Sequence, residues 1–289
     1  MQLFIDQLVN GVTLGSVYAL VAIGLSLIFG IVRLINFAHG EFFMLGAYIL
    51  FFTFVQAQVP YGLAIVLCVV GMGLVGAIFY KIVYEPVMDR KWTAQLVATL
   101  AASVILTNAA ILLFGGTQRG APTSLSNQVL ILGTLRVSYQ RLLAVAVTLV
   151  AFFLLDLFIT RTRIGRAMRA VSQNREVAQV VGINIRWIAL VTFSVSASLA
   201  GLAAALIAPL QTISPTMGAL LTLKAFAIVV IGGLGKVTGA VYAAFLVGLA
   251  ESLATVYVSS EYKDAVAFLL MIAFLIWRPR GLFGQKVGI

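Results

Sequence analysis

The sequence predicts an all-α fold, a polytopic bundle of membrane helices that forms a single transmembrane domain over residues 1–289. Hydrophobic residues make up 62% of the chain and charged residues only 10%, and the mean hydropathy is +1.10. A soluble domain carries about 25% charged and about 45–50% apolar residues, so this chain lacks the polar side chains that would cover a water-facing surface. The apolar residues also fall into long runs, near the ~20 residues that a spanning helix needs.

Nine apolar runs meet or nearly meet that length. They are 8–30, 36–56, 61–84, 94–114, 141–160, 187–208, 217–234, 237–258 and 263–278. The first 32 residues contain no Lys or Arg, and no small-residue cleavage site follows a short apolar core, so the start predicts a membrane helix and not a signal peptide. Because GGLG at 232–235 fits either a loop or a broken helix, we expect eight or nine spans.

Basic residues concentrate in alternate connections. With the N-terminus outside, 14 of the 19 Lys and Arg residues fall in inner connections and four in outer ones. The inner set is Arg33, Lys81, Arg90, Lys91, Arg161, Arg163, Arg166, Arg169, Arg175, Arg186, Lys236, Arg278, Arg280 and Lys286; the outer set is Arg119, Arg136, Arg141 and Lys263. Positive charge marks cytoplasmic loops, so this count predicts an outer N-terminus and a cytoplasmic C-terminus. The net charge of +10 then reflects topology, and we expect no nucleic-acid partner.

Two connections are long. Residues 115–140 carry Gly, Pro, Ser and Asn around the runs QVLIL and TLRVSY, which predicts a small hairpin on the outer face. Residues 161–186 contain six arginines and one acid, Glu176, with apolar residues at helical spacing. They predict one or two short amphipathic helices, the second ended by Gly182. Such a segment suits either the lipid surface or a docking contact with a cytoplasmic partner.

Small residues recur at helical spacing in several runs and predict tight helix packing. Gly11 and Gly15 lie four apart in the first run, and Ala244 and Gly248 do so in the eighth. Run 187–208 carries a longer stripe, from Ser194 to Ala208.

Ionisable residues inside spans are expensive and are functional candidates. Glu251 falls on the same face as Ala244 and Gly248, so it should point into the bundle. Lys224 sits seven residues into its run, where it either snorkels to the interface or joins the bundle interior.

The stretch LINFAHGEFFMLGAY at 34–48 holds the only histidine, His39, and Glu41 two residues later. Helical residues two apart point to different faces, so these two should not form an acid–base pair. Asn36 can cap the helix start. Either these groups pin the helix to its neighbours, or they line a translocation route.

No soluble active-site pattern is present: the chain lacks a phosphate-binding GxxxxGK[ST] loop, HExxH, CxxC and GxSxG. The single cysteine, Cys68, lies in an apolar run and predicts neither a disulfide nor a metal site. We therefore expect no enzyme activity, metal or cofactor in this chain, and any ATP would have to be bound by another one.

Several segments in order resemble one family of membrane proteins. They are NGVTLGSVYALVAIGLSLIFG (10–30), INFAHGEFFMLGAY (35–48), IGRAMRAV (164–171), VGIN (181–184), KAFAIVVIGGLGKVTGA (224–240), EYKD (261–264) and RPRGLFG (278–284). Together they resemble the LivH-type permease of high-affinity branched-chain amino acid ABC importers over nearly the whole chain. EVAQVVG is similar to the EAA-x₃-G core of the ATPase-docking loop in such importers, with Val177 in place of the second residue and without the later Leu-Pro.

The resemblance implies a complex in the bacterial inner membrane. Its other members would be a LivM-type second permease, two cytoplasmic ATPases and a periplasmic amino-acid-binding protein, with lipid around them. Within the basic loop at about 161–186, coupling to the ATPases is expected from Gly165, Arg166, Arg169, Glu176, Ala178 and Gly182. The translocation pathway or its gate is expected to involve Asn36, His39, Glu41, Lys224 and Glu251.

Two alternatives remain open at this stage. The same architecture serves urea, short amides or other amino acids in related transporters, and no residue here separates those substrates. A stand-alone secondary transporter would use Glu251, His39 or Glu41 as a proton relay, with GGLG as its broken helix.

Overall fold

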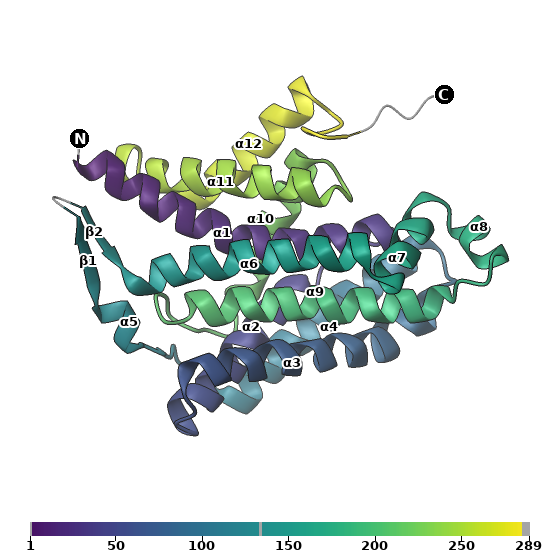
Figure 1. Cartoon of the computed structure of the whole chain (residues 1–289), viewed down its shortest axis with the longest axis horizontal. Helices are drawn as coiled ribbons and strands as arrows, with labels where there is room; N and C mark the ends of the chain where they lie inside the picture. Colours follow the sequence, from purple (N-terminus) through teal and green to yellow (C-terminus); the bar gives the residue numbers. More distant parts are fainter. Residues whose placement is uncertain (1, 133–134, 285–289) are drawn as a thin grey trace.

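The computed structural model describes residues 2–132 and 135–284, so that Lys286, one of the inner cations counted above, lies outside the described residues. Within those ranges the chain is mostly helical, as predicted, and forms one elongated bundle (Figure 1). The α-helices are α1 (Gln2–Val32), α2 (His39–Leu50), α3 (Tyr61–Phe79), α4 (Trp92–Phe114), α5 (Ser124–Asn127), α6 (Tyr139–Arg161), α7 (Arg163–Gln173), α8 (Arg175–Val180), α9 (Ile185–Ile207), α10 (Met217–Gly232), α11 (Val237–Tyr257) and α12 (Lys263–Trp277). Short π-helical segments, Phe51–Gln56 and Tyr80–Tyr84, extend α2 and α3, and a 3₁₀ turn, Glu85–Val87, follows the second.

Each of the nine apolar runs contains a helix, but the helices differ in length. Six are long and apolar enough to cross a membrane: α1, α3 with its extension to Val87, α4, α6, α9 and α11. By contrast, α2, α10 and α12 have only 12, 16 and 15 residues. The chain is thus a multi-pass membrane protein, while the count of eight or nine spans stays a prediction.

Helix α1 forms the centre of the bundle. In its most apolar stretch 89% of the residues are buried, and it packs against α6, α9, α10 and α11. The small faces predicted for α1 and α11 meet each other: a Cβ added to Gly11 would lie 2.7 Å from the Cα of Leu249, and one added to Gly248 would lie 2.6 Å from the Cα of Gly15. Only glycine allows these backbones to approach so closely.

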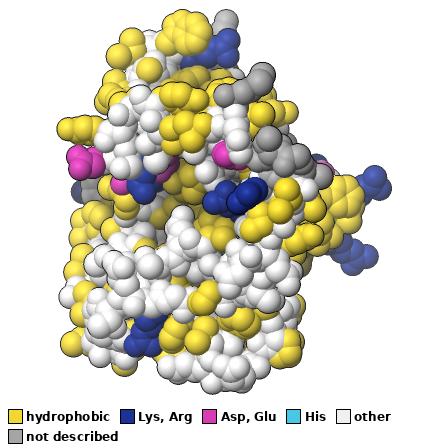
Figure 2. All heavy atoms as spheres, turned by 90° about the vertical axis from the view of Figure 1, so that its left-hand side faces the viewer, with side chains coloured by type: hydrophobic (Ala, Val, Ile, Leu, Met, Phe, Trp, Pro, Cys, Tyr) yellow, Lys and Arg dark blue, Asp and Glu magenta, His cyan; other side chains and the backbone are white. Residues whose placement is uncertain are grey.

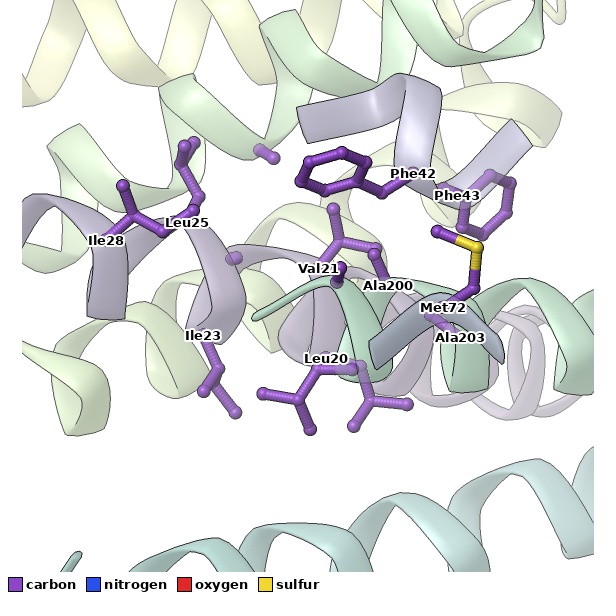
Figure 3. Packing of buried hydrophobic residues seen from close by; sticks show 14 of the residues in the cluster. Leu20, Val21, Ile23, Leu25, Ile28, Phe42, Phe43, Met72, Ala200 and Ala203 are labelled. Atoms are coloured by element: carbon purple, nitrogen blue, oxygen red, sulfur yellow. The ribbon is translucent and has the colours of Figure 1, made fainter. Parts of the chain in front are cut away.

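The small face of α9 packs against α3 in the same way. Ser194 Oγ donates a hydrogen bond to the carbonyl of Gly73 at 2.7 Å, and Ser198 Oγ donates to that of Val69 at 2.9 Å. Cys68 is buried at this contact, as the apolar run predicted. Figure 3 shows Met72, Ala200 and Ala203 gathered with Phe43 in this part of the core.

The helices at the periphery are exposed and apolar. Only 17% of the most apolar stretch is buried in α4 and in α6, against 89% in α1. Leu112 and Phe153 are among the large side chains that point outward, with exposed fractions of 85% and 66%. Such a surface would be unstable in water, so these helices need an apolar environment around the bundle.

The two ends of the bundle differ (Figure 1). At one end, near the N-terminus, β1 (Val129–Leu132) pairs antiparallel with β2 (Leu135–Ser138), which confirms the predicted hairpin. Its turn, 133–134, lies outside the described residues. At the opposite end α7 packs against the bundle and α8 extends outward from it. We call these the hairpin end and the basic-loop end.

Candidate functional site

Four helices contribute to a buried charge cluster around Lys224. Its Nζ lies 2.5 Å from Glu251 Oε1 and 2.6 Å from Asp264 Oδ1, so α10 is tied to both α11 and α12. Tyr18 of α1 completes the cluster: its hydroxyl accepts a hydrogen bond from Lys224 at 3.1 Å and donates one to Glu251 Oε2 at 3.0 Å.

The cluster decides between the two predictions for Lys224. Its exposed fraction is 4%, so the side chain does not snorkel but belongs to the bundle interior. Glu251, 3% exposed, points inward as its helical face predicted. Taking an ion out of water costs several kcal/mol, and only close partners with the opposite charge can offset that penalty. Two carboxylates around one ammonium group satisfy it and leave one negative charge in excess.

A cavity of about 580 Å³ adjoins this cluster. It lies between α1, α10, α11 and α12, with the start of α6 also in its wall. The residues in its wall are Gln7, Asn10, Thr13, Leu14, Val17, Tyr18, Phe43, Arg141, Ile207, Leu210, Gln211, Thr216, Met217, Leu220, Leu221, Lys224, Glu251, Ser252, Thr255, Lys263 and Asp264. Gln7 and Arg141 place it toward the hairpin end, and Figure 2 shows the acidic and basic side chains that gather on that face.

The histidine–glutamate stretch forms a separate polar group at the start of α2. His39 Nε2 lies 2.9 Å from the carbonyl oxygen of Val21 in α1, whereas Glu41 Oε1 accepts a hydrogen bond from Ser103 Oγ of α4 at 3.0 Å. The two side chains therefore contact different helices, as their spacing predicted. Both are fully buried, and neither lies in the wall of the cavity.

Asn36 acts just before the helix. Its Oδ1 accepts a hydrogen bond from the backbone N–H of Ala38 at 3.1 Å, which shapes the turn into α2. Ala38, and not Asn36, occupies the N-cap position, so the predicted cap is displaced by two residues. Asn36 thus shapes the turn before α2, and His39 and Glu41 tie the first turn of α2 to α1 and α4.

Helices α2 and α10 cross at two glycines. A Cβ at Gly40 would overlap the carbonyl oxygen of Gly218, and a Cβ at Gly218 would lie 2.7 Å from the carbonyl oxygen of Gly40. The backbone N–H of Gly40 donates to Thr222 Oγ1 at 2.8 Å. Because α10 also carries Lys224, this crossing connects the buried polar group at α2 with the charge cluster.

At the basic-loop end, α7 is anchored in the bundle. Thr162 caps it by accepting a hydrogen bond from the Gly165 N–H at 2.9 Å, and Met168 and Val171 are buried. Gly165 packs directly on the backbone of Ile159, where a side chain would not fit. These two short amphipathic helices, α7 and α8, were predicted.

Two of the predicted coupling residues are the arginines of α7. Arg166 is exposed, and Arg169, also exposed, donates a hydrogen bond to the carbonyl of Thr160 at 3.2 Å.

Helix α8 is the more exposed of the pair. Asn174 caps it by accepting hydrogen bonds from the N–H groups of Glu176 and Val177 at 3.0 and 3.1 Å. Ala178 is buried, Glu176 is exposed, and Gly182 ends the segment with a φ of +85°.

Three valines on and after α8 point into the surroundings. The exposed fractions are 57% for Val177, 86% for Val180 and 69% for Val181. The amphipathic pattern located these residues but did not show that the described part of the chain leaves them uncovered. An apolar surface of this kind beside arginines is typical of a contact with another protein or with the membrane surface.

Comparisons with known proteins agree with the resemblance. The family described as branched-chain amino acid transport system / permease component matches residues 7–275. The high-affinity branched-chain amino acid transport system permease protein BraD of Pseudomonas aeruginosa is 35% identical, over 98% of this chain and 96% of its own length. LivH of Salmonella typhimurium, with the same description, is 36% identical over the same shares. LivM of Escherichia coli is 27% identical over 93% of this chain and 68% of its own length. This chain therefore belongs to the family of branched-chain amino acid transport system permease components.

Proposed function

We propose that this chain is a permease subunit of an ATP-binding-cassette importer that moves leucine, isoleucine and valine inward across the bacterial inner membrane. The relatives with 35–36% identity carry that substrate class in their names and match 98% of the chain. In this proposal the N-terminus is outside, the C-terminus is cytoplasmic, and eight or nine segments cross the membrane. The hairpin end then faces the periplasm.

The observation that carries the proposal is the exposed α8 at the basic-loop end. Val180 and Val181 leave more than two thirds of their surface uncovered. Burial of apolar surface is worth roughly 25 cal/mol per Å², so covering these valines would contribute favourably to the binding of a partner. We assign this contact to a cytoplasmic ATPase, with Arg166, Arg169 and Glu176 as the charged rim.

The anchoring of α7 explains how such a contact can act on transport. α7 packs against α1, α6 and α9, and Gly165 allows the backbones to touch. A push on α8 is therefore carried into the spanning helices and is not absorbed by a loose loop. Gly165, Ala178 and Gly182 serve this rigidity, while ATP would be bound and hydrolysed by the partner and not by this chain.

The remaining partners follow from the same family. Similarity to LivM suggests a second permease of related fold beside this one, and a periplasmic binding protein would deliver the amino acid at the hairpin end. Lipid would cover α3, α4 and α6. Of the residues expected along the route, Lys224 and Glu251 adjoin the cavity, whereas we assign Asn36, His39 and Glu41 to the positioning of α2.

Uptake of labelled leucine tests the proposal. Cells that lack this chain are compared with cells in which it is restored, with unlabelled valine, arginine or urea as competitor. Restored uptake that valine blocks and arginine and urea do not is the expected result. Inhibition by urea, or uptake that does not respond to the chain, would overturn the assigned substrate.

Energy coupling is measured separately in the same cells. We expect uptake to continue after the proton gradient is collapsed and to stop when ATP is depleted. The opposite result would favour the secondary transporter, for which His39 and Glu41 are poorly placed because they contact different helices.

A further inference from the structure

We infer that the cavity beside the charge cluster binds an amino acid by its zwitterionic head group, with Asp264 receiving the ammonium group and Arg141 the carboxylate. The inference rests on the proposed function and names the place within this chain where its substrate is held.

The ammonium end of the site follows from the charge count. Lys224 neutralises only one of its two carboxylate partners, so the cluster carries an excess negative charge. The two carboxylates are not equivalent: the side chain of Glu251 is 4% exposed, whereas that of Asp264 is 36% exposed. Glu251 is also held by Tyr18 at 3.0 Å. Glu251 is therefore the internal partner of Lys224, and Asp264 has oxygen surface free to accept from a second cation.

Arg141 supplies the opposite charge. It is half-buried at the start of α6, in the wall of the same cavity, and within the described residues it forms no ion pair closer than 4.0 Å. Asp6 interacts with it electrostatically at longer range. A guanidinium group offers a planar pair of donors that matches a carboxylate. Lys263 also borders the cavity but is exposed.

The rest of the wall suits a branched aliphatic side chain. Leu14, Val17, Phe43 and Leu221 present apolar surface, and Asn10, Thr13, Ser252 and Thr255 add neutral polar groups. Small-ligand sites typically combine a largely apolar lining with a few polar groups in a volume of about 300–1,000 Å³. The 580 Å³ cavity falls in that range.

Labelling with a photoreactive leucine is the direct test. A diazirine analogue that keeps the α-ammonium and α-carboxylate groups is photolysed with the purified permease complex, and labelled peptides are identified by mass spectrometry. We expect adducts on the α1 segment around Leu14–Tyr18 and the α10 segment around Met217–Lys224. Leucine should compete with the label, whereas 4-methylpentanoate, which lacks the ammonium group, should not.

Asp264→Asn isolates the ammonium contact. An amide oxygen still accepts from Lys224, and the Lys224–Glu251 pair stays balanced, so the bundle should fold normally. A hydrogen bond to a charged group contributes about 1.5–3 kcal/mol, so labelling and leucine uptake should fall by roughly tenfold or more. Glu261→Gln is the matched control, since it neutralises an exposed carboxylate three residues away.

Arg141→Gln isolates the carboxylate contact in the same way, with the exposed Arg136 as control through Arg136→Gln. Wild-type labelling and uptake in both Asp264→Asn and Arg141→Gln would overturn the site, as would adducts confined to peptides outside the cavity or absent altogether. If instead the wild-type chain supports no ATP-dependent amino acid uptake, the proposed function itself fails. The two failures are thus distinguishable.

Discussion

A single buried lysine holds two carboxylates, and this imbalance decides which substitutions the bundle tolerates. Lys224→Met would leave the buried Glu251 and the half-buried Asp264 with no cation between them. Removal of one partner from a buried pair typically costs about 3–5 kcal/mol, so we expect a large fall in the thermal midpoint of the detergent-purified chain. Glu251→Gln should have a much smaller effect, because Asp264 then balances Lys224.

Fluorescence-detected size-exclusion after heating would rank these variants. Equal loss of folded protein in Lys224→Met and Glu251→Gln would contradict the charge count. The double change Lys224→Met with Glu251→Gln should recover part of the stability, because only Asp264, the more exposed carboxylate, then stays charged.

At this scale the sequence predicted some positions and missed others. The position of Ala244 and Gly248 on the same helical face as Glu251 was enough to predict that Glu251 points into the bundle. The ion pair between Lys224 and Asp264 could not be predicted from the sequence. The two residues lie in different helices, and a contact between helices leaves no periodic signal along the chain. Tyr18 was hidden for the same reason, in a run where every face is apolar.

Among the elements, the crossing of α2 and α10 is the tightest constraint near the site. Gly40→Ala would push a methyl group into the Gly218 carbonyl, and overpacking of this kind costs about 1–3 kcal/mol. We expect reduced thermal stability and reduced uptake together. Gly62→Ala, in a helical position with nothing within 4 Å, is the control and should be near neutral. Normal stability of Gly40→Ala would show that the crossing is looser than described.

Helix α8 makes a separate prediction. Val180→Asp adds a charge to the most exposed of the valines, so it should weaken ATPase binding without affecting the fold. Buried interface anchors often account for 2 kcal/mol or more, so uptake should fall by about tenfold or more. Gln179→Asp, one residue earlier and also exposed, should keep most activity. Glu176→Lys tests the charged rim and should uncouple ATP hydrolysis from transport.

Co-purification of the ATPase with each variant is measured alongside leucine uptake, because it reports binding of the ATPase directly. Intact binding by Val180→Asp would remove α8 from the interface. The sequence predicted these helices from their apolar spacing and from Gly182, because local signals define short helices. The sequence could not distinguish a valine buried against the bundle from an exposed one, because the exposure of each valine depends on how α7 is oriented relative to α6.

For the molecule as a whole, the orientation of the two ends is open to direct measurement. Cys68 is the only cysteine and is buried, so Cys68→Ala gives a background without thiols. Asn127→Cys at the hairpin end and Gln179→Cys at the basic-loop end both introduce exposed thiols. We expect a membrane-impermeant maleimide added to intact spheroplasts to label the first and not the second.

Labelling of Gln179→Cys alone would show that the chain has the opposite orientation to the one proposed. The order and approximate limits of the helices in the nine apolar runs were predictable, because apolar length and small-residue spacing are local properties of the sequence. The shortness of α2 was not, because the change from α-helix to π-helix at Phe51 falls inside the continuous apolar run 36–56. Composition cannot show where a helix stops when both sides of the break are equally hydrophobic.

The length of α1 connects the two ends. Its 31 residues at about 1.5 Å per residue give a rod of about 46 Å that contacts α7 near one terminus and borders the cavity with Gln7 and Tyr18 toward the other. A helix resists compression along its axis, so a displacement imposed at α7 reaches the cavity wall as motion of one stiff part. In the proposed importer, α1 would therefore transmit motion directly from the ATPase contact at the basic-loop end to the amino acid site at the hairpin end, without a relay of side-chain rearrangements between them.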